Sequence, residues 1–87
     1  MSTPEQHQNC TNRFVELANT MKDEGLDPSL VSGALMTASG IYATYLAAGN
    51  NAALEPSGVD KVCLVYRNTL ERFQSLKKDQ LMKQALK

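Results

Sequence analysis

No charged residue occurs from Pro28 to Leu54, and this stretch of 27 residues constrains the fold more than any other feature of the chain. The remaining segments of the 87-residue chain carry all nine of its basic and all nine of its acidic side chains. A helix exposed to water normally has a charged face, so a stretch without charge indicates a segment covered by protein. We therefore expect residues 28–54 to contain the core of the fold.

A chain of 87 residues is long enough for one domain, so we expect residues 1–87 to form a single helical domain. A core of this size is marginal, and neither a disulfide framework nor a metal cluster is evident to support it. Association with a second subunit is the expected supplement.

The charges are divided unevenly along the chain. Residues 1–60 contain seven acidic and two basic side chains, whereas residues 61–87 contain two acidic and seven basic ones. This asymmetry favours a basic third helix that lies beside an acidic first helix. The alternative is a basic tail that binds an acidic partner.

Three helices are predicted, over residues 4–24, 28–48 and 58–84. Thr3 and Gln6 have capping-box spacing at the start of the first helix, and Gly25 is a natural stop. Asp27 and Pro28 begin the second helix, and Ser57 with Asp60 forms a loose capping box for the third. Apolar residues recur at helical spacing on all three; in the first helix they are Cys10, Phe14, Leu17 and Met21.

Short links between long helices favour an all-α, antiparallel three-helix bundle. The apolar stripe of the third helix breaks after Leu76, since Leu81, Met82, Ala85 and Leu86 point elsewhere. We expect residues 77–87 to be a frayed tail or a tail that docks on a partner.

The second helix has two unequal sides. Its wide apolar side, from Leu30 to Leu46, can face the other two helices. The opposite side is a row of mostly small residues with coiled-coil spacing, and two glycines in mid-helix cost about 2 kcal/mol relative to alanine. We predict that this seam pairs with the seam of a second copy in a two-fold dimer. Its residues are Gly33, Met36, Gly40, Ala43 and Ala47. The alternative is that the glycines admit a bulky side chain, such as Phe14 or Phe73, from a neighbouring helix.

Three tyrosines lie on the predicted core sides of the second and third helices. A buried tyrosine needs a partner for its hydroxyl, and Asn19 is a candidate. Tyr42, Tyr45, Tyr66 and Asn19 could thus line a pocket for a small ligand between these helices. The alternative places the tyrosines at the rim of the core with wet hydroxyls.

Catalytic and metal-binding patterns are weak. His7, Cys10 and Cys63 could supply three zinc ligands, but free cysteines are more often buried in the core. A nucleophilic cysteine needs a base, and His7 is the only histidine. No phosphate-binding glycine motif occurs either. We therefore expect no enzyme activity, no metal and no cofactor.

Neither nucleic acid nor membrane is an expected partner. The lysines at positions 77, 78, 83 and 87 lack interleaved aromatic residues, and the net charge is zero. The uncharged stretch is long enough to span a bilayer, but it contains several polar residues and is bracketed by Asp27 and Glu55. The first residues do not resemble a secretory signal, and the two cysteines have no CxxC spacing, so we expect a cytoplasmic protein.

Three segments resemble those of a bacterial family of small uncharacterised proteins, domain of unknown function 3144. They are residues 13–19, residues 31–35 and residues 66–70, and the resemblance covers roughly residues 8–76. It implies an all-helical fold and supplies no activity, cofactor or catalytic residue. From the seam and the lack of a catalytic pattern, we expect a homodimeric interaction or adaptor module without catalytic activity. The alternative is a small-ligand-binding protein with a tyrosine-lined pocket.

Overall fold

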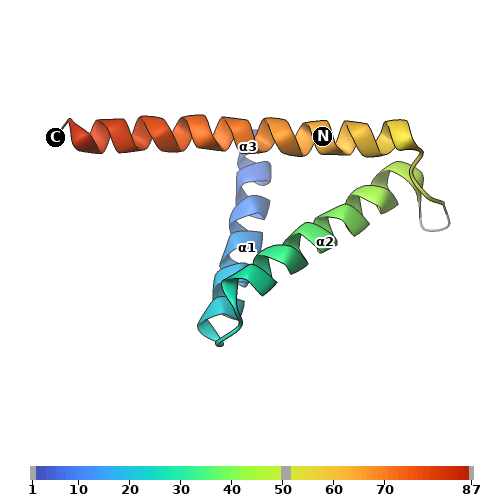
Figure 1. Cartoon of the computed structure of the whole chain (residues 1–87), viewed down its shortest axis with the longest axis horizontal. Coiled ribbons are helices and arrows are strands. Elements are labelled where there is room, and N and C mark those ends of the chain that lie inside the picture. Colours follow the sequence, from blue (N-terminus) through green and yellow to red (C-terminus); the bar gives the residue numbers. More distant parts are fainter. Residues whose placement is uncertain (1, 50–51, 87) are drawn as a thin grey trace. The chain divides into compact units, whose positions relative to one another are not determined.

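The computed structural model describes residues 2–49 and 52–86, and these residues form three α-helices with no strand among them. Helix α1 spans Pro4–Asp23, α2 spans Pro28–Ala48 and α3 spans Pro56–Ala85 (Figure 1). The predicted all-α class is therefore confirmed. Asn50 and Asn51, which lie between the second and third predicted helices, and Lys87 of the predicted tail lie outside the described residues.

Thr3 caps the first helix as its sequence predicts. The backbone amide of Gln6 donates to Thr3 Oγ1 over 3.1 Å, and Gln6 Oε1 accepts from the backbone amide of Thr3 over 2.9 Å. These reciprocal bonds satisfy two amides that have no partner within the helix. Pro4 follows at the first helical position, where a missing amide hydrogen costs nothing.

Gly25 ends α1 and turns the chain toward α2. Its φ of 97° lies in the left-handed region that glycine adopts without a steric penalty. The Gly25 amide donates to the carbonyl of Lys22, and the Leu26 amide donates to the carbonyl of Met21. This pair of bonds is the Schellman motif. Asp27 then caps α2, since its Oδ1 accepts from the amide of Ser29 over 2.8 Å.

The start of α3 corrects one expectation. The helix begins at Pro56, and its N-cap is Glu55, which makes no side-chain capping bond. The predicted capping box of Ser57 with Asp60 is therefore wrong. The physical reason is that proline has a fixed helical φ and no amide hydrogen, so Pro56 can open the helix without a side-chain cap.

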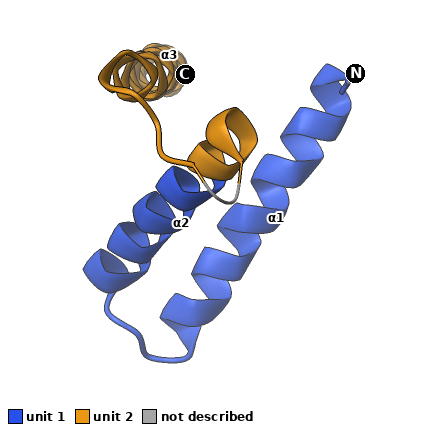
Figure 2. Cartoon of the chain, turned by 90° about the vertical axis from the view of Figure 1, so that its right-hand side faces the viewer, with its two compact units in different colours: residues 1–42 blue, residues 43–87 orange. Residues whose placement is uncertain are grey.

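The chain divides into two compact units, Met1–Tyr42 and Ala43–Lys87 (Figure 2). In the first unit, α1 and the first part of α2 form a helical hairpin whose connection is the Gly25 turn. The second unit contains the end of α2, closed by Gly49 with a φ of 83°, and the whole of α3. The single domain expected from the chain length stays a prediction.

Helix α3 is the longest element, with 30 residues against 21 in α2 and 20 in α1. It continues without interruption through Lys77 and Lys78 to Ala85, and Leu86 closes it. At 1.5 Å per residue, α3 is about 45 Å long and α2 about 31 Å. A hairpin of α1 and α2 is therefore too short to cover α3 from end to end.

Candidate protein-binding surfaces

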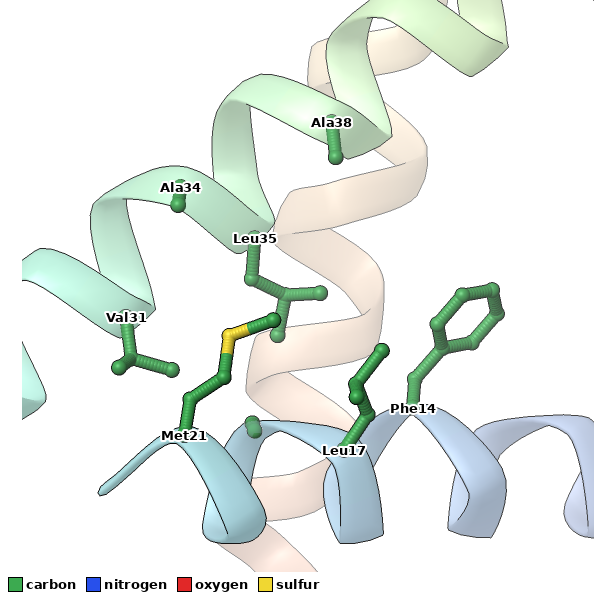
Figure 3. A pocket seen from close by; sticks show the side chains of 8 residues that line it. Phe14, Leu17, Met21, Val31, Ala34, Leu35 and Ala38 are labelled. Atoms are coloured by element: carbon green, nitrogen blue, oxygen red, sulfur yellow. The ribbon is translucent and has the colours of Figure 1, made fainter. Parts of the chain in front are cut away.

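The hairpin unit contains an apolar groove between α1 and α2, with a volume of about 240 Å³. Figure 3 shows that side chains of both helices converge on it, with Met21 and Val31 at one end and Phe14 and Ala38 at the other. The residues that line this groove are Phe14, Leu17, Ala18, Met21, Val31, Ala34, Leu35 and Ala38. We call this surface the hairpin groove.

The apolar face that the sequence predicts for each helix supplies the hairpin groove. On α1 these residues recur at intervals of three and four, and on α2 they do so from Val31 to Ala38, which places each set on one side of its helix. The pairing of α1 with the wide apolar side of α2 is thus observed. Cys10, predicted in the same stripe, does not line the groove.

The hairpin groove is open. Val31 is 8% exposed and is the one buried residue in the part of the chain that the structure describes, whereas Phe14 remains 61% exposed. Large apolar side chains left in water forgo about 1.5–3 kcal/mol each of potential burial energy. A surface of this kind favours association with another apolar face.

The predicted seam lies on the other side of α2. Taking Val31, Ala34, Leu35 and Ala38 as the groove side, helical periodicity places Gly33 and Gly40 about 150–170° from its centre. Within the first unit, a Cβ atom built on either glycine would meet no atom of α1 within 4 Å. Phe14 therefore does not pack against these glycines, and the alternative with Phe73 stays a prediction. Met36 and Ala47 are exposed, and Ala43 is half-buried.

Helix α3 presents its own apolar stripe. Three exposed side chains recur every seven residues along it: Val59, Tyr66 and Phe73. Val62 lies between the first two, and Leu76 follows the last. Charged side chains lie on other sides of the helix, where Arg67 Nε pairs with Glu71 Oε1 over 2.8 Å. The helix is amphipathic, as predicted, with an apolar face that is not buried.

The residues of the predicted ligand pocket are all exposed. Asn19 and Tyr42 belong to the first unit, and Tyr45 and Tyr66 belong to the second. None of the four lines the hairpin groove. The pocket stays a prediction.

Both cysteines are exposed, so the predicted burial of Cys10 and Cys63 is wrong. Cys10 lies one turn before the hairpin groove begins at Phe14, and it borders a shallow cavity with Arg13, Phe14 and Leu17. Within the described residues, no three His, Cys, Asp or Glu side chains come together as a metal site.

Helix α2 is also long and apolar enough to cross a membrane, judged by length and composition. This is weak evidence, because the core helix of a water-soluble protein satisfies the same criteria. The expectation of no membrane partner therefore stays a prediction.

No protein-family model matches the chain, and neither does any curated protein or solved structure. The resemblance to domain of unknown function 3144 is neither supported nor refuted by these comparisons.

Proposed function

We propose that this protein is a cytoplasmic, homodimeric interaction module without catalytic activity. Each copy would be an antiparallel three-helix bundle, and two copies would pair through the seam of α2, formed by Gly33, Met36, Gly40, Ala43 and Ala47. The proposal rests on one observation: α2 carries no charge on either side, while α1 contacts only one of them.

The bundle is supported by two exposed apolar surfaces and by complementary charge. The hairpin groove and the stripe of α3 are both apolar and both open, and each would remove the other from water. Residues 2–42 contain five acidic and two basic side chains, whereas α3 contains three acidic and six basic ones. Opposite net charges around an apolar contact favour its formation and its register.

The dimer is supported by the cost and position of the glycines. In an isolated helix Gly33 and Gly40 each cost about 1 kcal/mol relative to alanine. Space beside Gly33 is not filled by any side chain of α1. Close approach of a second backbone would offset the cost through dispersion contacts along the seam. Because a two-fold dimer uses the same patch on both copies, one seam suffices.

The oligomeric state tests the proposal. We expect sedimentation equilibrium to show a dimer at micromolar concentration, and Gly33→Leu to weaken it by a factor of about 100 or more, since the added side chain holds the backbones apart. Ser39→Leu is the matched control, because Ser39 lies between the seam and the groove side of α2.

Gly33→Leu should leave helix content unchanged, because leucine is the better helix former. Circular dichroism of both variants therefore separates a loss of pairing from a loss of folding. A wild-type chain that is monomeric at micromolar concentration would contradict the proposal, as would a chain that enters uncharged phospholipid vesicles instead of pairing.

A further inference from the structure

The last turns of α3 carry a second apolar face that points away from the first. At 100° per residue, Leu81, Met82, Ala85 and Leu86 centre about 130° from the stripe of Val59, Tyr66 and Phe73. Leu81 and Met82 are 54% and 64% exposed. Because α3 is one unbroken helix as far as Ala85, no single neighbouring surface can cover both faces. We call residues 77–86 the tail.

The tail is also basic. Lys77, Lys78 and Lys83 stand against a single acidic residue, Asp79. Lys78 lies within the apolar face itself, and its aliphatic stem can cover apolar surface while its ammonium group reaches an acidic neighbour. A fitting partner surface is therefore both apolar and acidic.

The connection between α1 and α2 has both properties. Leu26 is exposed there, and Asp23, Glu24 and Asp27 surround it with Lys22 as the one basic residue. The Schellman bonds to Lys22 and Met21 hold this turn in one conformation, so its binding would cost little ordering entropy.

From this complementarity we infer that the tail of one copy docks on the α1–α2 connection of a second copy. The inference rests on the proposed function. In the proposed bundle, the hairpin of the same chain would cover the first stripe of α3, and the apolar face of the tail would point outward. Two tails facing each other would instead bring like charges together.

This contact is compatible with the proposed dimer in one orientation. In the proposed antiparallel bundle, α3 would run back toward the α1–α2 connection, so its tail and that connection would lie at the same end of a copy. Two α2 seams that run parallel place the tail of each copy beside the connection of the other. The dimer then has two reciprocal tail contacts.

The first experiment measures the dimer dissociation constant. Changing Leu81→Ser and Met82→Ser together should raise it about tenfold or more, since losing one buried apolar side chain is worth about that factor. The matched control is Gln80→Ser with Gln84→Ser, which changes the same turns on the other side of the helix. An unchanged constant for the tail variant would overturn the inference while leaving the seam dimer intact.

Charge exchange locates the contact. Lys78→Glu should weaken the dimer, Glu24→Lys should weaken it similarly, and the two together should restore at least part of the loss. Additive losses would contradict contact between the tail and the connection. Binding of the wild-type tail to anionic vesicles, lost in Lys78→Glu with no change in dimerisation, would assign the tail to lipid and overturn the inference.

Cross-linking decides which chain the tail meets. In a background with Cys10→Ser and Cys63→Ser, chains carrying only Leu26→Cys are mixed with chains of different mass carrying only Leu86→Cys. A disulfide needs Cα atoms within about 7 Å, so a mixed disulfide under mild oxidation is the expected result. The tail would instead fold onto its own chain if no mixed disulfide formed and if a chain that carries both Leu26→Cys and Leu86→Cys formed an internal disulfide.

A wild-type chain that sediments as a monomer would remove the proposed function and this inference together. A dimer that persists in the tail variants, but not in Gly33→Leu, would remove this inference alone.

Discussion

The backbone amide of Leu26 donates to the carbonyl of Met21 over 3.2 Å, and this bond closes the turn from which α1 and α2 diverge. Met21 lines the hairpin groove, whereas Leu26 is exposed on the connection. One short turn thus joins the two surfaces for which we propose partners: the groove and the acidic connection.

Gly25 should be the least replaceable residue of that turn. We expect Gly25→Ala to lower the free energy of unfolding by about 1–2 kcal/mol, because a Cβ atom is disfavoured in the left-handed region. Urea denaturation followed by circular dichroism measures the change. Gly33→Ala in the proposed seam is the comparison, since its backbone is an ordinary helix; equal effects of the two changes would argue against this account of Gly25.

The capping box of α1 should contribute measurably. Replacing Thr3 with alanine removes the acceptor for the Gln6 amide and should cost about 1 kcal/mol of stability. Thr11→Ala is the control. The Thr11 hydroxyl donates to the carbonyl of His7, which lies inside the helix and does not need a side-chain partner. A Thr3→Ala variant as stable as the wild type would show that the first turn of α1 is not formed in solution.

Leu35 reports whether the hairpin groove is covered. Leu35 is 42% exposed on the wall of the groove. Leu35→Ala should cost about 2–5 kcal/mol if a third helix buries the groove, and markedly less if the groove stays in water. Chemical denaturation gives the value, with Leu46→Ala as the control, because Leu46 lies outside the groove and is 87% exposed. A loss below about 1 kcal/mol would contradict the proposed bundle.

The ion pair of Arg67 with Glu71 should contribute little. The side chains are 76% and 62% exposed, one helical turn apart. Such pairs contribute about 0.3–0.5 kcal/mol, and screening by salt reduces this further. Glu71→Gln should therefore change the melting temperature by no more than a few degrees at low salt and less at high salt. A large loss would mean that Arg67 or Glu71 has a role at an interface.

Local signals in the sequence were sufficient for most of the secondary structure. Thr3 with Gln6, Gly25, and Asp27 with Pro28 were predicted as helix ends, and the backbone and side-chain bonds of each are present. These signals act over a few residues, so no knowledge of the fold is needed to interpret them. The third helix begins at Pro56, two residues before the predicted start, because proline can open a helix without a capping side chain.

Burial could not be inferred in the same way. The apolar spacing indicated which faces of α1 and α2 meet, and the hairpin groove combines Leu17, Met21, Val31 and Leu35 as that spacing implies. The exposure of Cys10 did not follow from the spacing, because it depends on where along α1 the contact with α2 ends. The tyrosines and the seam remain predictions, since their environment depends on surfaces outside a single hairpin.

The sequence by itself determined that the chain is helical, where its helices begin and end to within a few residues, and that α2 has no face suited to water. Only the tertiary structure decided that the groove side of α2 meets α1 while the glycine side, at Gly33, has no atom of α1 within 4 Å. The reason is physical: helix formation follows from bonds between residues four apart, whereas the choice of a packing face depends on shape matching between segments distant in the chain.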